Sequence, residues 1–109
     1  MTLLDAIING HGSEIKELIA GMYSYKELAS KIVCQDGVEI SVQCSRFHYC
    51  EPRSDDGPYT AVEVGFPTED PPESWAEYAD GNYPADVYGY VPAELVRQFI
   101  ESHGGEQPT

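Results

Sequence analysis

Three residues near the middle of the chain, Cys44, His48 and Cys50, are of the types that bind metal ions. His48 and Cys50 are two residues apart, so their side chains would point to the same face of a strand. However, the spacing matches neither CxxC nor HxxxH, which are typical of zinc sites. We therefore expect no metal and no cofactor. A small metal-binding protein or enzyme built on these three residues is a less favoured interpretation.

Nucleophilic or carboxylate catalysis is the other chemistry that these residue types allow. A catalytic cysteine needs a base and positive surroundings to lower its pKa, whereas the surroundings here are acidic. Asp55 and Asp56 are adjacent in a predicted turn, where acids usually only solvate the loop. The sequence has neither GxSxG nor a glycine-rich phosphate loop. We therefore expect the protein not to be an enzyme.

Net charge is the unusual property of this chain. Its 109 residues include 19 acidic and 6 basic side chains, which gives a net charge of −13. Residues 51–86 carry ten of the acids and one base, Arg53, and so hold about two thirds of the net charge. Direct binding to nucleic acid is disfavoured, because contacts to phosphates need Lys and Arg. A basic protein surface would instead be attracted.

Length and composition are typical of one globular domain. We expect this domain to cover residues 1–105, followed by a flexible tail over residues 106–109. No apolar run approaches the roughly 20 residues that cross a bilayer, and no secretory signal is recognised, so we expect no membrane association. Three cysteines, an odd number, favour free thiols in the cytoplasm. Either a monomer or a homodimer is compatible with the sequence.

The first third of the chain has the apolar spacing of three short helices. Thr2 and Ser13 are candidate caps of the first two, which cover residues 3–8 and 15–22. Ser24 and Glu27 form a capping box for the third, which runs to residue 33. Residues 31–35 are ambiguous, because the following Asp-Gly pair is typical of a tight turn that would close a hairpin. We favour the helix because it has a cap.

From Val38 onward, apolar and polar residues alternate, which predicts strands. The first strand has an inward face of Val38, Ile40, Val42 and Cys44. Its alternation inverts near Ser45, which a bulge or an exposed aromatic face would explain. A second strand over residues 59–66 should pair with it as an antiparallel hairpin. Its inward residues are predicted to be Val62, Val64 and Phe66.

After Pro67, an acidic segment is predicted to run into a short helix that ends near Asp80. A third strand follows over residues 86–91, and a last helix begins at Pro92 and ends at Gly104. The strand is predicted to point Val87 and Val91 inward and Tyr88 and Tyr90 to the other face. The helix is predicted to bury Leu95, Val96, Phe99 and Ile100. This order predicts an α+β fold, with a three- to four-stranded, mainly antiparallel sheet and helices packed on one face.

The acidic residues 51–86 are interleaved with tyrosines and one tryptophan, which are the residues that dominate protein interfaces. Acids on a rigid scaffold can also imitate a phosphate backbone. The alternative interpretation is a solvated face that only maintains solubility. The candidate partner-binding residues are Asp55, Asp56, Glu69, Asp70, Glu73, Trp75, Glu77, Tyr78, Asp80, Tyr83, Asp86 and Tyr88.

In size, acidity, cysteine use and α+β pattern, the chain resembles small inhibitors encoded by phages and mobile elements, such as anti-CRISPR proteins. The resemblance implies a non-enzymatic inhibitor that covers a basic nucleic-acid-binding surface, for example of a CRISPR effector complex, and blocks access of DNA or RNA. The chain also resembles the acidic immunity or antitoxin-like proteins that neutralise basic toxins. No functional residue is carried over from either class.

Overall fold

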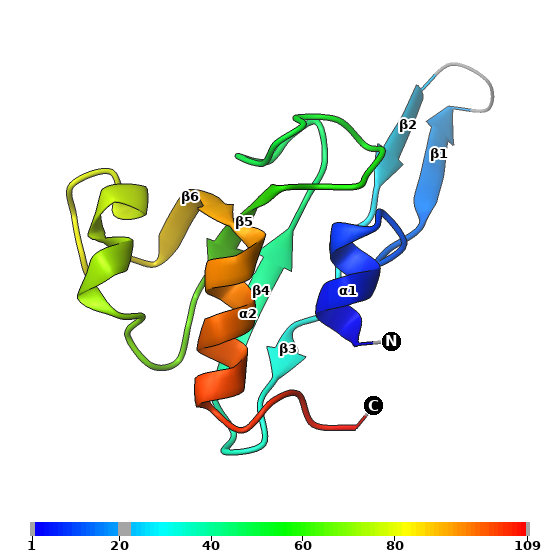
Figure 1. Cartoon of the computed structure of the whole chain (residues 1–109). Coiled ribbons are helices and arrows are strands. Elements are labelled where there is room, and N and C mark those ends of the chain that lie inside the picture. Colours follow the sequence, from blue (N-terminus) through cyan, green and yellow to red (C-terminus); the bar gives the residue numbers. More distant parts are fainter. Residues whose placement is uncertain (1, 20–22, 109) are drawn as a thin grey trace.

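The computed structural model describes residues 2–19 and 23–108. The predicted α+β class is confirmed: one antiparallel sheet has the order β3-β4-β5-β6, and a second consists of β1 and β2 alone. The elements in Figure 1 are α1 (Leu3–Ile8), β1 (Ile15–Ile19), β2 (Tyr23–Lys26), β3 (Ile32–Val33), β4 (Glu39–Gln43), β5 (Ala61–Gly65), the 3-10 helix η1 (Glu73–Ala79), β6 (Val87–Pro92) and α2 (Ala93–Ser102).

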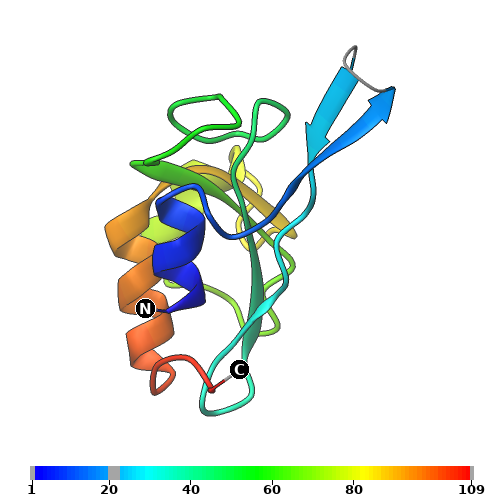
Figure 2. The same ribbon diagram turned by 90° about the vertical axis from the view of Figure 1, so that its right-hand side faces the viewer.

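Helices α1 and α2 lie on the same side of the four-stranded sheet, as Figure 2 shows. Arg97 of α2 donates to Asp5 of α1 across 2.8 Å, which joins the two helices. The sheet face beneath them is apolar, as the alternation predicts, and includes the buried residues Ile40, Val42, Val62 and Val64. The prediction for Phe66 is wrong. This residue follows β5 at a φ of 50°, and its side chain is exposed.

The last helix is close to its prediction. Val96, Phe99 and Ile100 of α2 are buried, while Leu95 is half-buried against the same core. The chain leaves the helix through Gly104 at a φ of 90°, a conformation that favours glycine. None of the helices formed by the described residues has the length and apolar character needed to cross a bilayer.

The second and third predicted helices are wrong, because this part of the chain forms the antiparallel hairpin β1-β2. Ile15 pairs with Lys26 at its base. Isoleucine and tyrosine favour strands over helices, and the pairing satisfies the backbone groups that a helix would have satisfied internally. Figure 2 shows this hairpin extending away from the four-stranded sheet. Residues 20–22 of the second predicted helix lie outside the described residues.

Within the ambiguous residues 31–35, Ile32–Val33 form strand β3, so the favoured helix is wrong and the hairpin alternative is correct. Ile32 pairs with Ile40 of β4. The turn between the strands uses Gly37 at a φ of 91°, and the Val38 N–H donates to the Asp36 carboxylate at 3.0 Å. Such an Asp-Gly turn closes a hairpin at no steric cost to the glycine.

Two residues of the C-terminal segment, Glu106 and Gln107, contact the N-terminal part of the fold, while the expected flexibility of the segment stays a prediction. Glu106 forms a β-bridge with Cys34 beside β3. Its carboxylate accepts hydrogen bonds from the Leu3 and Leu4 N–H groups at 2.9 and 3.1 Å. These are among the first N–H groups of α1, which have no partner within the helix. The last residue of the tail, Thr109, lies outside the described residues.

Removing the Glu106 carboxylate should therefore destabilise the protein through α1. We expect Glu106→Ala to lower the free energy of unfolding by about 1–2 kcal/mol, as for loss of a helix cap. Urea unfolding followed by circular dichroism measures this change. Glu101→Ala is the matched control, because Glu101 is exposed on α2. Equal losses in the two variants would contradict a capping role.

His103 ties the end of α2 to two loops. Its Nδ1 lies 2.6 Å from Asp36 Oδ2, in the β3-β4 turn, and its Nε2 lies 3.1 Å from Glu69 Oε2, in the loop after β5. The ring also packs on Phe99, with the centroids 4.7 Å apart. The pKa of Asp36 is lowered, first by the hydrogen bond from the Val38 N–H and then by the one to His103.

This lowered pKa predicts an acid dependence of stability. The contribution of Asp36 is fully present above the unfolded pKa near 3.8 and is lost as the pH falls through the lower folded pKa. Asp36→Asn should therefore lose less stability than the wild-type protein on acidification from about pH 5 to pH 3. Urea unfolding at several pH values tests this. Asp56→Asn is the control, because it removes the same charge from an exposed site. If it weakens the pH dependence of the free energy of unfolding as much as Asp36→Asn does, the effect comes from net charge and not from the contacts of Asp36.

Candidate functional site

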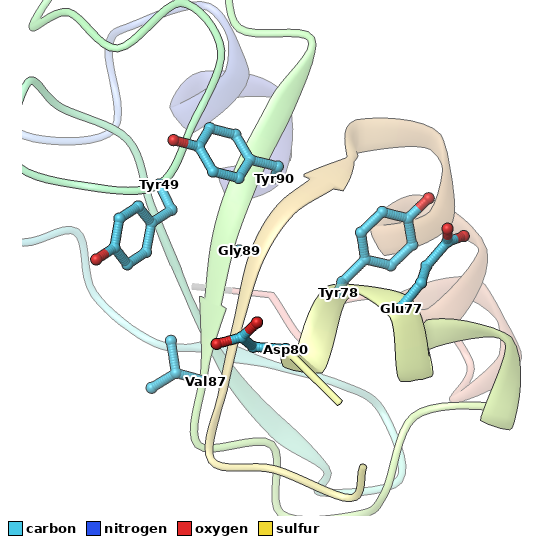
Figure 3. A pocket seen from close by; sticks show the side chains of 7 residues that line it. All are labelled: Tyr49, Glu77, Tyr78, Asp80, Val87, Gly89 and Tyr90. Atoms are coloured by element: carbon cyan, nitrogen blue, oxygen red, sulfur yellow. The ribbon is translucent and has the colours of Figure 1, made fainter. Parts of the chain in front are cut away.

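A surface pocket of about 400 Å³ lies between η1, β6 and the segment after β4. Figure 3 shows Tyr78 and Glu77 on one side of β6 and the rings of Tyr49 and Tyr90 on the other. The other residues that line the pocket are Asp80, Val87 and Gly89. The pocket thus combines three tyrosines, an apolar side chain and two carboxylates, and its lining contains no base.

A β-bulge in β6 gives the pocket its shape. Val62 pairs with Val91 and Val64 pairs with Tyr88, so two residues of β6 lie opposite one residue of β5. Tyr90, one of these two, has a φ of 55°, which is uncommon for a residue with a bulky side chain. An extra residue inverts the alternation of the strand from that point, and bulges of this kind redirect side chains. The ring of Tyr90 is consequently directed away from the core and lines the pocket.

The residue that holds the bulge in place is Tyr49. Its carbonyl accepts a hydrogen bond from the Tyr90 N–H at 2.9 Å, and its own N–H donates to the Glu63 carboxylate at 3.2 Å. The two tyrosine rings lie 5.8 Å apart, centroid to centroid. Gly89 permits this packing, because a Cβ there would lie only 3.1 Å from the Tyr49 Cβ. The wall made by Tyr49 and Tyr90 is therefore part of the folded framework.

The acids of the pocket come from η1 and its end. Asp80 ends η1 in a left-handed conformation, with a φ of 52°, which aspartate tolerates better than most residues. Among the described residues, neither Glu77 nor Asp80 forms an ion pair. Loss of hydration raises the pKa of the Tyr78 hydroxyl, and the adjacent Glu77 carboxylate raises it further. Within residues 2–19 and 23–108, the two carboxylates at this end of the pocket thus carry their charge without an ion pair.

Of the predicted partner-binding residues, Glu77, Tyr78 and Asp80 line this pocket. Two predicted anchors, Trp75 and Tyr88, are instead core residues with exposed fractions of 2% and 0%. Their rings meet edge to face at 5.7 Å. The bulge turns Tyr88 inward, opposite to the predicted alternation, and leaves Val87 exposed. Trp75 and Tyr88 therefore cannot contact a partner in this structure.

Other predicted residues have partners within the chain. The Asp55 carboxylate accepts two hydrogen bonds from Arg46, one from the backbone N–H at 3.0 Å and one from the guanidinium group at 2.5 Å. Glu69 lies against His103, and the Tyr83 hydroxyl donates to a backbone carbonyl of the loop before η1. These three side chains hold loops in place. The remaining predicted residues, all exposed, are Asp56, Asp70, Glu73 and Asp86.

The acids of residues 51–86 do not lie on one continuous face. Residues 51–58 form a loop beside α1, where the following Tyr59 N–H donates to the Ile8 carbonyl at 2.7 Å. Helix η1 instead packs against β6, and Figure 1 shows these two regions on different sides of the molecule. A single pattern that imitates a phosphate backbone along the whole segment is therefore not supported. The pocket beside β6 is one region in which acids and exposed tyrosine rings coincide.

The cysteine and histidine residues considered for metal binding are engaged in local packing. The Cys50 thiol donates to the carbonyls of Ser45 and Pro52, each at 3.3 Å, and His48 Nδ1 lies 2.6 Å from Ser45 Oγ. Burial raises the pKa of Cys44 to about 12 and also raises that of Cys50. Across residues 2–19 and 23–108, no group of three or more His, Cys, Asp and Glu side chains is arranged to hold a metal ion.

Four lining residues, Tyr49, Val87, Gly89 and Tyr90, were not among the predicted binding residues. Two features of the sequence point toward them. The alternation inverts near residue 45, which allows an exposed aromatic face, and a glycine within a predicted strand often marks a bulge. Neither feature shows that Tyr49 contacts β6, because that contact depends on how β6 pairs with β5.

Comparison with protein-family models, curated proteins and solved structures finds no match. Function must therefore be inferred from the site itself.

Burial of the thiols predicts their reactivity. Cys34, Cys44 and Cys50 are all buried, and burial raises the pKa of each, so little thiolate is present at neutral pH. We expect a thiol reagent such as DTNB to label none of the three rapidly in the native protein and all three in urea. Fast labelling of one thiol in the native state, at unchanged circular dichroism, would contradict this burial.

Proposed function

We propose that this protein is a non-enzymatic inhibitor that uses the pocket beside β6 to bind a basic surface of a target protein. The observation that carries the proposal is the coincidence of Glu77 and Asp80, which have no ion pair among the described residues, with the exposed rings of Tyr49 and Tyr90. Tyrosines at a pocket supply contact area at low entropic cost, and the acids supply charge complementarity.

The charge of the whole chain supports the same kind of partner. At a net charge of −13, the protein attracts a basic surface over a distance and accelerates the encounter. Basic surfaces of this kind are typical of nucleic-acid-binding proteins, because they neutralise phosphates. Binding would exclude DNA or RNA by occupying the same surface, as in a CRISPR effector complex. We place this encounter in the cytoplasm, where free thiols persist.

The test measures binding to a target and its consequence for nucleic acid. The protein is immobilised, targets are captured from host lysate at low salt, and the captured protein is then purified. We expect its association rate constant to fall by about tenfold or more between 50 and 500 mM salt, because charge steers the encounter. We also expect the inhibitor to displace DNA or RNA from the target in a competition assay.

Charge-matched variants separate the pocket from the total charge. Glu77→Gln with Asp80→Asn should weaken target binding by about tenfold or more, since two carboxylates are lost from the contact. Asp56→Asn with Glu101→Gln removes two exposed charges elsewhere and should leave binding within about threefold. A target that binds equally well to both double variants, or that keeps its nucleic acid bound, would refute the proposal.

A further inference from the structure

The walls of the pocket have the chemistry that receives an organic cation. The rings of Tyr49, Tyr78 and Tyr90 offer aromatic faces or edges, and Val87 adds an apolar surface. In Figure 3 the Asp80 carboxylate points toward the side where Val87 and Tyr49 lie. A cation next to an aromatic face is attracted by the ring quadrupole, and a carboxylate nearby strengthens the attraction.

The chain itself already places guanidinium groups on aromatic rings in this region. Arg53 lies over the Tyr49 ring, with its guanidinium carbon 5.2 Å from the centroid. Arg46 lies over the neighbouring Phe47 ring at 4.6 Å. The Tyr49 ring is thus an acceptor for a guanidinium group, and the same ring lines the pocket.

The size of the pocket is sufficient for one long side chain. Its volume of about 400 Å³ lies near the lower end of the range for small-molecule sites, which begins at roughly 300 Å³. The methylene groups of a long basic side chain would pack against Val87 and the tyrosines. Its charged end would reach Asp80, which forms no ion pair within the described residues.

We infer that the pocket binds a single arginine side chain of the partner, with its guanidinium group stacked on a tyrosine ring and paired with the carboxylate of Asp80. That this arginine belongs to a target protein rests on the function proposed above. Arginine fits better than lysine for two reasons. Its planar group stacks on aromatic rings, and it is less strongly hydrated than an ammonium group, so moving it into a tyrosine-lined pocket costs less.

The bulge explains why the site is ready to bind. The backbone of Tyr90 is held at a φ of 55° by its hydrogen bond to the Tyr49 carbonyl, and its ring packs on that of Tyr49 with the centroids 5.8 Å apart, so both rings are already in place when the ligand arrives. Strained residues of this kind cluster at ligand sites, where the surrounding structure imposes the conformation. Preorganisation lowers the entropic cost of binding.

The test uses small capped amino acids instead of the partner. The 15N-labelled protein is titrated with N-acetyl-arginine amide, N-acetyl-lysine amide and N-acetyl-citrulline amide at low salt, and amide chemical shifts are recorded. We expect saturable shifts at Val87, Gly89 and Tyr90 with arginine, and about fivefold weaker binding of lysine. Citrulline has the same shape without the charge, and it should produce no saturable shift at these amides.

Two variants of Tyr90 provide the matched control. Tyr90→Phe keeps the ring and should keep the arginine affinity within about twofold, whereas Tyr90→Asn tolerates the positive φ, removes the ring and should weaken binding by about fivefold or more. The bulge itself is checked in each variant by the amide shifts of its neighbours. Citrulline or lysine binding as tightly as arginine would overturn the inference, as would saturable shifts confined to residues 51–58.

The outcomes also distinguish this inference from the proposed function. If the target still depends on Glu77 and Asp80 but arginine amide does not bind, the arginine pocket is refuted and the acidic binding surface stands. If arginine amide binds at the pocket but the target is indifferent to the carboxylates, the proposed function is refuted and the pocket stands.

Discussion

The β-bulge at Gly89 and Tyr90 is the constraint on which both the core and the candidate site depend. Because two residues of β6 lie opposite one residue of β5, Tyr88 and Val91 both face inward although they are three residues apart. The inward Tyr88 ring meets Trp75 and thereby attaches η1 to the sheet. The same extra residue directs Tyr90 outward against Tyr49. One irregularity in hydrogen bonding thus builds the aromatic core on one face and the aromatic wall of the pocket on the other.

The excess negative charge divides into two kinds of carboxylate. Asp55 and Glu69 have basic partners, Arg46 and His103, and hold loops in place. Glu77 and Asp80 have no ion pair among the described residues and lie beside exposed tyrosines. Glu77 and Asp80 can offer their charge to a partner without first breaking an ion pair within the described residues, and they lie beside exposed tyrosines, which is why the proposed function concentrates on η1 and β6. The candidate binding surface therefore includes only a few of the acids in residues 51–86.

Elements with one dominant periodicity were predicted correctly. β4 and β5 alternate strictly until their ends, and α2 carries its apolar stripe at helical spacing. The β1-β2 hairpin was missed because its isoleucines and leucine satisfy helical spacing in the sequence, while their strand propensity acts only once the two strands pair. Three of the candidate partner-binding residues line the pocket, and their role stays a prediction. Residues close in sequence, such as Glu77 and Asp80, were found, whereas Tyr49 joins them through a contact between distant segments.

The sequence by itself determined the α+β class, the antiparallel pairing of β4 with β5, the concentration of acids in residues 51–86 and the absence of a recognisable catalytic motif. These properties follow from composition and local periodicity, which act over a few residues. Only the tertiary structure decided which aromatic rings are exposed and which acids remain without a partner. The physical reason is that strand register and bulges depend on hydrogen bonds between segments far apart in the chain, and a shift of one residue moves every following side chain to the opposite face.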